Sequence, residues 1–268
     1  MIIGIDIGST TTKAVSLEDG AVVKKIKTRA MDAITSATGA LGKLQLENGI
    51  KMSEIKRIMI TGAGASKIEG DLFGIPTQKV NEISAIGTGG MYLSGQNHIV
   101  IANIGTGTAI IEASREKIIH LGGSGVGGGT ILGLAKKLLS LSDFKDIMSL
   151  AASGNLETVD LLLEDIMAMD MGFLNKKSTA SNFGKMLDMA RNEDVAFGII
   201  NMVYQVIGML SVFAARSRNI DRVIVTGSGS HNPLGQKVLS DITSMHSVIF
   251  EYPRDAEYTT AVGAGLSS

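Results

Sequence analysis

The stretch of residues 3–15 constrains the fold of this chain most, because it reads as a strand, a tight turn and a second strand. Apolar residues alternate with Gly4 and Asp6, the pattern breaks at Gly8, and apolar residues resume at Ala14. Glycine lets a turn come close to a ligand, and the amides and hydroxyl groups of a turn can hold phosphate oxygens. The stretch therefore predicts a phosphate-binding hairpin.

Two charged residues of this hairpin strengthen the interpretation. Asp6 ends the first strand, where its carboxylate can hold a magnesium ion directly or through water. Lys13 follows the turn and supplies a point positive charge for phosphate oxygens. Taken alone, the stretch is also compatible with an ordinary polar hairpin turn.

A second hairpin of the same kind occurs in the middle of the chain. Residues 102–113 again read as an apolar strand, a turn of Gly and Thr, and another apolar strand. They form a weak internal repeat with residues 4–15. Two such hairpins facing each other across a cleft can hold a polyphosphate from both sides.

Two further glycine-rich segments are similar to other nucleotide-binding motifs. Residues 62–67 follow a buried strand but lack the Gly-Lys-Ser/Thr ending of a P-loop, so a Walker A site is excluded there. Gly123, Gly125 and Gly128 have the spacing of a dinucleotide-binding fingerprint between a strand and a helix. An NAD(P)-dependent oxidoreductase is thus an alternative, but helices rather than a regular βαβ pattern follow, and both hairpins stay unexplained.

Composition narrows the class of protein. The chain has 268 residues, 44% of them hydrophobic, which is enough for two domains or one large one. Its formal net charge is −1 and it has no basic run, so nothing indicates nucleic acid or an anionic membrane. It has no cysteine, which excludes disulfides, cysteine-ligated clusters and a thiol nucleophile.

Residues 195–215 have the length of a membrane span but contain Asn201 and Gln205, so a buried central helix, or one shared with a partner subunit, explains them better.

Apolar spacing and capping residues predict the remaining elements. Asn81 is a suitable N-cap for a helix that runs to about residue 93, with Glu82 in its first turn, where a carboxylate also suits the helix dipole. Asn192 is expected to cap the long apolar helix. Other helices are expected at residues 30–48, 131–139, 143–153, 157–169 and 258–266, and after Pro233, while residues 178–184 are expected to form a polar turn. Strands are expected at residues 57–61, 76–80, 98–102, 117–121, 222–226 and 247–252, and those at 57–61 and 98–102 are expected to be buried.

An ordered set of motifs resembles one protein family. The motifs are residues 4–13, 61–67, 81–83, 103–108 and 121–130, extended by 179–184 and 227–232. The two hairpins resemble the phosphate loops of the superfamily of actin, sugar kinases and heat-shock chaperones. The whole set resembles type II (eukaryote-like) pantothenate kinases and covers nearly the whole chain. The first hairpin also resembles activators of 2-hydroxyacyl-CoA dehydratases, but these hold an iron–sulfur cluster with cysteines, which this chain lacks.

The resemblance implies an α/β fold with two ribonuclease-H-like (actin-like ATPase) domains, residues 1–96 and 97–268. Their mixed sheets would be flanked by helices, with a nucleotide cleft between the domains. The implied reaction transfers the γ-phosphoryl group of ATP to pantothenate, giving 4′-phosphopantothenate in the first step of coenzyme A biosynthesis, with ATP and Mg²⁺ as cofactors. The implied protein is a cytoplasmic homodimer that binds this small molecule and neither nucleic acid nor membrane.

The resemblance also implies roles for individual residues. Glu82 matches the catalytic base, which takes the hydroxyl proton, and Asp6 would act with Mg²⁺. The residues implied to hold phosphate are Gly8, Ser9, Thr10, Thr11, Lys13, Gly105, Thr106, Gly107 and Thr108. Gly127, Gly128 and Gly129 would let the backbone approach the nucleotide, with Gly227 and Ser228 near the adenosine. Glu82, Thr106 and His120 would contact the acceptor.

One position departs from the family pattern. The family typically has an Arg a few residues before the triple glycine, where it contacts the substrate and the transferred phosphate, and this chain has His120. Histidine is shorter and mostly neutral near pH 7. Two other interpretations therefore stay open: a kinase of the same fold for another small hydroxyl acceptor, such as a sugar, and a non-catalytic ATP-dependent switch.

Overall fold

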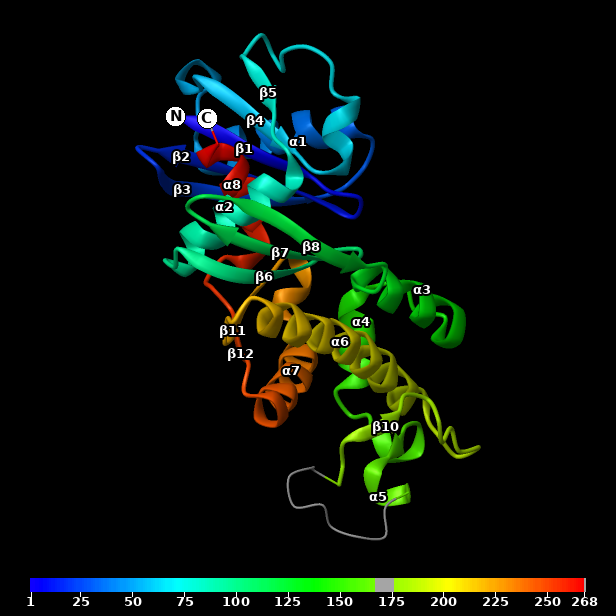
Figure 1. Ribbon diagram of the computed structural model, residues 1–268. Coiled ribbons are helices and arrows are strands. Elements are labelled where there is room, and N and C mark those ends of the chain that lie inside the picture. Colours follow the sequence, from blue (N-terminus) through cyan, green and yellow to red (C-terminus); the bar gives the residue numbers. More distant parts are fainter. Residues whose placement is uncertain (167–175, 268) are drawn as a thin grey trace.

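The computed structural model describes residues 1–166 and 176–267. The described chain contains two five-stranded sheets stacked above one another with two helices between them (Figure 1). Further helices cover the outer face of each sheet. The fold is thus the expected α/β arrangement of two mixed sheets flanked by helices.

The first sheet has the order β3-β2-β1-β4-β5. Its strands are β1 (Ile2–Ile7), β2 (Thr11–Glu18), β3 (Ala21–Arg29), β4 (Arg57–Thr61) and β5 (Thr77–Lys79). The first three strands are antiparallel, and β1, β4 and β5 are parallel. Helix α1 (Ala33–Asn48) covers the outer face and buries Leu41 and Leu44 there. Asp32 caps its first turn by accepting from the Thr35 N–H at 2.9 Å.

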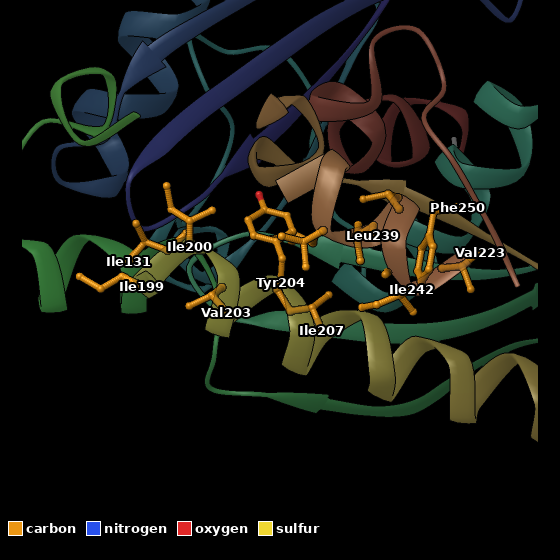
Figure 2. Packing of buried hydrophobic residues seen from close by; sticks show 14 of the residues in the cluster. Ile131, Ile199, Ile200, Val203, Tyr204, Ile207, Val223, Leu239, Ile242 and Phe250 are labelled. Atoms are coloured by element: carbon orange, nitrogen blue, oxygen red, sulfur yellow. The ribbon is translucent and has the colours of Figure 1, made fainter. Parts of the chain in front are cut away.

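The second sheet repeats this plan in the order β12-β11-β6-β7-β8. Its strands are β6 (His98–Ile104), β7 (Thr108–Ser114), β8 (Ile118–Ser124), β11 (Arg222–Thr226) and β12 (Ile249–Glu251). The helices on its outer side are α3 (Gly128–Leu139), α4 (Phe144–Ala151), α6 (Asn192–Ser217) and α7 (Pro233–His246). Figure 2 shows the core between α6, α7 and this sheet, where Tyr204, Ile207, Leu239 and Ile242 pack together.

Helices α2 (Glu82–Ser94) and α8 (Thr259–Leu266) form the middle layer. Their backbones touch, since a Cβ atom on Gly263 would collide with the Ala85 carbonyl, and one on Gly89 with the Thr259 carbonyl. The C-terminal helix packs on the first sheet, with Ala261 against β2 in one small core. Each predicted half therefore holds one sheet, while a domain boundary between residues 96 and 97 stays a prediction.

The internal repeat extends further than the two hairpins. Residues 57–66 (Arg-Ile-Met-Ile-Thr-Gly-Ala-Gly-Ala-Ser) match residues 222–231 (Arg-Val-Ile-Val-Thr-Gly-Ser-Gly-Ser-His). Each segment is a parallel strand followed by a glycine and a 3-10 turn, Ala63–Lys67 in one case and Ser228–His231 in the other. Gly62 and Gly227 share a left-handed conformation, with φ of 87° and 80°, which favours glycine. Strands β4 and β11 are therefore structural equivalents.

The helix predicted at residues 157–169 is wrong in the described part. The chain instead forms a 3-10 turn (Leu156–Thr158), strand β9 (Leu161–Leu162) and a single helical turn, α5 (Leu163–Ile166), and residues 167–169 lie outside the described range. Strand β10 (Thr179–Ser181), where a turn was expected, pairs with β9. Asp160 explains the difference, because its fully buried carboxylate accepts from the Phe183 N–H and the Asn201 amide at 2.9 and 2.7 Å. These long-range bonds replace a local helix.

The long helix α6 starts differently from the prediction but occupies the expected place. Arg191, not Asn192, is its N-cap, and buried Asp194 accepts from the Arg191 N–H at 3.0 Å. Among the described residues it is the one helix long and apolar enough to cross a bilayer, and 67% of its most apolar 18-residue stretch is buried in the fold. It therefore acts as the core helix of the second half.

The remaining described 3-10 turns are Met52–Glu54 and Ala256–Tyr258.

Candidate active site

A cavity of about 560 Å³ opens where the ends of β1, β2, β6 and β7 converge. Most residues predicted for the site line it together. They are Asp6, Gly8, Ser9, Thr10, Thr11, Lys13, Glu82, Gly105, Thr106, Gly107, Thr108, Gly128, Gly129, Gly227 and Ser228. The structure therefore brings both hairpins, the glycine-rich segments and the predicted base to one place.

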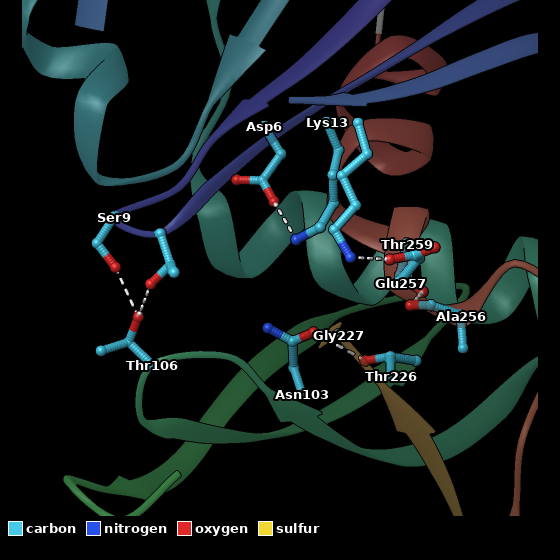
Figure 3. Close-up of polar contacts among 12 residues, drawn as sticks. Asp6, Ser9, Lys13, Asn103, Thr106, Thr226, Gly227, Ala256, Glu257 and Thr259 are labelled. Atoms are coloured by element: carbon cyan, nitrogen blue, oxygen red, sulfur yellow. Dashed lines mark hydrogen bonds and ion pairs between the residues drawn. The ribbon is translucent and has the colours of Figure 1, made fainter. Parts of the chain in front are cut away.

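The turns of the two hairpins touch each other directly (Figure 3). The Ser9 and Thr106 hydroxyl oxygens are 2.6 Å apart, and Thr10 Oγ1 lies 3.4 Å from Thr106 Oγ1. The second turn is also fixed from behind, because the N–H groups of Gly128 and Gly129 donate to the carbonyls of Gly105 and Thr106, both at 2.9 Å. The hydroxyls and amides of the two turns are thus gathered around one small volume.

A row of polar side chains crosses the inner face of the first sheet. Asp6 pairs with Thr61 of β4 on one side and with Lys13 of β2 on the other, and Lys13 pairs with Lys27 of β3. Lys13 Nζ is 3.8 Å from Asp6 Oδ2. Lys27 Nζ is 2.7 Å from Glu257 Oε2, so the outer lysine joins the sheet edge to the turn before α8. The row presents one carboxylate and two ammonium groups to the cavity.

Asp6 and Glu82 are the carboxyl groups among the described residues that line the cavity, and the protonation of both is perturbed. Burial raises the pKa of Asp6 to about 6, against the lowering effect of Lys13 and with a smaller contribution from Glu82. Glu82 opens α2 behind the N-cap Asn81, which accepts from the Ser84 N–H at 3.1 Å. Glu82 keeps contact with solvent, yet desolvation of its carboxyl group raises its pKa, and Lys13 lowers it. Both groups thus lie within the field of the same lysine.

Two predicted site residues do not line the cavity. Gly127 packs against the back of the second turn, where an added Cβ would stand 2.7 Å from the Thr106 carbonyl oxygen. His120 is exposed on β8, opposite Ile111, whose side chain belongs to the core beneath α2. A Cβ on Gly123 would be 3.6 Å from His120 Nε2. The imidazole therefore points along β8 toward the end of the strand that borders the cavity.

The two other basic residues near His120 lie at the wrong end of the strand to replace it. Arg115 Nε donates to Asn97 Oδ1 at 2.9 Å in the turn between β7 and β8. Lys117 precedes β8, whereas the opposite end, at Ser124, lines the cavity. His120 is thus the titratable side chain of β8 that is nearest to the cavity.

Sequence reasoning missed part of the cavity wall. The additional lining residues are Lys27, Ala63, Asn103, Ala109, Ser124, Ile131, Leu132, Phe144, Tyr204, Gly229 and Thr260. The large apolar ones, Ile131, Leu132, Phe144 and Tyr204, come from α3, α4 and α6 and form a wall suited to a flat, apolar ring. Tyr204 donates to the Gly229 carbonyl at 2.6 Å. The hairpin register could have revealed Lys27, opposite Lys13, but no local signal marks Tyr204 or Phe144.

The chemistry of the cavity suits phosphoryl transfer. Backbone amides, hydroxyls and lysines converge at one end and can neutralise phosphate oxygens, and a carboxylate at the start of α2 can accept a proton. The described residues contain no group of three or more His, Asp or Glu side chains arranged to hold a metal ion. An ion bound here would therefore depend on Asp6 together with ligands from elsewhere.

Comparisons with known proteins agree with this geometry. A model of the Fumble family matches residues 98–267. A type II pantothenate kinase of Bacillus cereus is 31% identical over 278 residues, covering 98% of this chain and 96% of the relative. A protein of the same name from Staphylococcus aureus (strain USA300) is 28% identical and covers 98% of both chains.

Solved structures show a similar fold at low sequence identity. The activator of 2-hydroxyisocaproyl-CoA dehydratase from Clostridium difficile with bound ADPNP has a TM-score of 0.71 at 19% identity, covering 99% of this chain and 93% of that one. A ROK family glucokinase from Streptomyces griseus in complex with glucose and AMPPNP has a TM-score of 0.64 at 15% identity, covering 100% and 98%.

The duplicated sheets, with two hairpin turns meeting at one cavity, define the actin-like ATPase and sugar-kinase class of fold. The sequence relatives then narrow the class. The chain belongs to the Fumble family and, by similarity over nearly its whole length, to the type II pantothenate kinases.

Proposed function

We propose that this protein transfers the γ-phosphoryl group of ATP to the primary hydroxyl of pantothenate, giving 4′-phosphopantothenate and ADP, the first step of coenzyme A biosynthesis. The observation that carries the proposal is the position of Glu82, on the same cavity as both phosphate turns and Lys13. The names of the sequence relatives support pantothenate as the acceptor and do not favour another acceptor or a non-catalytic switch.

ATP would lie with its phosphates between the two hairpin turns and its base toward the apolar wall. The turn hydroxyls of Ser9 and Thr106 would exchange their mutual contact for phosphate oxygens. Lys13 would offset negative charge on the transferred group. Gly227 and Ser228, at the start of a 3-10 turn that lines the cavity, would lie beside the nucleoside.

Mg²⁺ fits the site through Asp6. Mg²⁺ in phosphate-transfer sites is usually held by one or two carboxylates, the phosphates and several waters. Asp6 supplies one buried carboxylate with 8% of the residue exposed, at the cavity edge. When bound with the nucleotide, the ion neutralises charge that develops on the phosphates.

Glu82 would act as the general base. Its carboxylate would take the proton from the acceptor hydroxyl as the oxygen bonds to the γ-phosphorus and the bond to the bridging oxygen of ADP breaks. Lys13, which lowers the pKa of Glu82, favours the ionised form that the base requires. His120, which points along β8 toward the cavity, would face the acceptor in the place of the family arginine.

We further propose a homodimer that forms through α6. Leu210 and Phe213 of this core helix are 37% and 59% exposed. They provide an apolar strip that a second copy could cover. A cytoplasmic location fits the proposed substrate and the burial of α6 within the fold.

The test is ADP release measured with a panel of acceptors and Mg²⁺. We expect turnover that depends on pantothenate, and loss of turnover with retained ATP binding in Glu82→Gln. The exposed Glu69→Gln is the matched control and should keep wild-type turnover. Turnover with a sugar but not with pantothenate, or an active Glu82→Gln, would overturn the proposal.

The pH profile tests the same role for Glu82. The base works only when ionised, and burial raises its pKa above the ordinary 4.5. The value of kcat/KM should therefore fall as the pH drops through this raised pKa, so that the acid limb lies above pH 4.5. An acid limb that follows the ordinary glutamate value would contradict desolvation of this group.

A further inference from the structure

The repeat places Thr61 and Thr226 in equivalent positions. Thr61 ends β4 beside Asp6 of β1, and Thr226 ends β11 beside Asn103 of β6, in the same parallel register. The glycine that follows each threonine contacts the neighbouring side chain. A Cβ on Gly62 would lie 2.6 Å from Asp6 Oδ1, and one on Gly227 would lie 2.9 Å from Asn103 Oδ1. The two Oδ1 atoms are thus equivalent as well.

The two threonines differ in their hydrogen bonds. Thr226 Oγ1 donates to Asn103 Oδ1 at 2.9 Å (Figure 3). The Thr61 hydroxyl is fully buried and has no hydrogen-bond partner among the described residues. A buried hydroxyl without a partner is unfavourable, whereas a hydroxyl that donates to a carboxylate forms a strong, charge-assisted bond. Asp6 Oδ1 is the atom equivalent to Asn103 Oδ1, so it is the expected acceptor for the Thr61 hydroxyl group.

We propose that Thr61 is a positioning residue for phosphoryl transfer, whose hydroxyl donates to Asp6 Oδ1 when the site is loaded. Rotation about the Cα–Cβ bond of Thr61 moves its hydroxyl group to another staggered position. The equivalent bond from Thr226 to Asn103 shows that a threonine at this place in the sheet can reach the neighbouring Oδ1 atom. The bond fixes the carboxylate and leaves Oδ2, the oxygen that faces Lys13, available to the cavity. The role of Thr61 rests on the proposed kinase function, because it acts through Asp6.

The same sheet contains a matched comparison. Thr12 of β2 is also fully buried, and its hydroxyl also lacks a partner among the described residues. It pairs with Ile7, whose side chain belongs to the core beneath α1, so Thr12 lies on the face away from Asp6. A hydroxyl that is merely tolerated should behave alike at both positions.

Binding of Mn²⁺ in the presence of AMPPNP, followed by the loss of the free-ion EPR signal, tests the proposal without an acceptor. Thr61→Val should weaken Mn²⁺ binding about tenfold or more, as loss of a partner of a metal-holding carboxylate does. Thr61→Ser should restore wild-type affinity, and Thr12→Val should keep it. Unchanged affinity in Thr61→Val, or no rescue by Thr61→Ser, would overturn the proposal.

Steady-state kinetics provide a second readout. Thr61→Val should lower kcat while the KM for pantothenate stays at the wild-type value, since Thr61 is fully buried and is not among the residues that line the cavity. An increase in this KM with unchanged kcat would contradict a role through Asp6. If Thr61→Val does not fold, Thr61→Ala compared with Thr12→Ala serves the same purpose. A wild-type protein without pantothenate turnover would refute the proposed function, yet the Mn²⁺ comparison would still decide the role of Thr61.

Discussion

The hydroxyl oxygens of Ser9 and Thr106 lie 2.6 Å apart, although the two residues are separated by 97 positions in the sequence. They come from the turns of two hairpins in different sheets. The contact is therefore a direct link between the two halves at the mouth of the cavity. In the nucleotide-free protein this contact occupies two hydroxyl groups that would otherwise be free to donate hydrogen bonds to phosphate oxygens.

This link predicts coupling between the two residues in the nucleotide-free protein. Ser9→Ala and Thr106→Val should each lower the free energy of unfolding by about 0.5–1.5 kcal/mol, the usual net value of one hydrogen bond. The double variant should lose little more than Thr106→Val alone, because Thr106→Val already lacks the contact with Ser9 as well as the weaker one with Thr10. Denaturant unfolding of the four proteins measures this, and additive losses would show that the contact contributes nothing.

The close contact between α2 and α8 predicts an unusually sensitive glycine. Gly263→Ala should destabilise the protein by about 1–3 kcal/mol or more, because the new methyl group meets the Ala85 carbonyl, which is backbone and cannot turn away. Gly133→Ala is the control, since this helical glycine of α3 is exposed and has open space around it. It should gain about 0.5–1 kcal/mol from helix propensity. Equal midpoints for both variants in urea would contradict the tight packing.

The meeting of both hairpins at one cavity was largely predictable, because the main parts of this candidate site are local. Strand, turn and strand follow each other within residues 3–15, so alternation and glycine placement were sufficient to find the first hairpin. The similarity between residues 57–66 and 222–231 is also visible in the sequence. It was missed because each of the two segments, taken alone, reads as an ordinary strand and turn. A comparison of the sequence with itself would have revealed it.

The missed features depend on contacts between distant segments. Lys27 and Glu257, which form an ion pair, are 230 positions apart in the sequence, and no local sequence pattern predicts their contact. Tyr204 looks like one more apolar position of α6, and it joins the cavity only because α6 crosses beneath the turn at Gly229. The helix predicted after residue 157 failed for a related reason, since partners far along the chain hold Asp160.

The buried carboxylate of Asp6 should lower the free energy of unfolding, although the proposed reaction requires it. Its pKa is about 6 in the folded protein against an ordinary 3.8, so between these values the folded state holds a proton that the unfolded state releases. The free energy of unfolding therefore falls as pH rises through this window, and above it the full cost of the buried charge remains. At 1.36 kcal/mol per pKa unit this cost is on the order of 2–3 kcal/mol.

Asp6→Asn should therefore raise Tm at pH 8 while it abolishes turnover, and the gain in Tm should shrink at pH 5. Thermal unfolding at the two pH values measures the difference. The exposed Asp188→Asn is the control and should show no such pH-dependent gain. A lower Tm for Asp6→Asn at pH 8 would mean that the ion pair with Lys13 outweighs the cost of burial.

The family resemblance implies an arginine in the place of His120, and the exposed position of His120 on β8 leaves room for a longer side chain. Arginine is longer than histidine and always charged, and it can donate two bonds to a carboxylate or a phosphoryl oxygen. His120→Arg should therefore raise kcat/KM for pantothenate about tenfold, as one charge-assisted hydrogen bond of about 1.5 kcal/mol would. Lys117→Arg is the matched control, because it places a guanidinium before the far end of the same strand, where no gain is expected. Steady-state kinetics on both variants, with pantothenate and an uncharged acceptor, separate the outcomes. A loss of activity in His120→Arg would indicate that the site is shaped for histidine and for an acceptor that does not need the arginine.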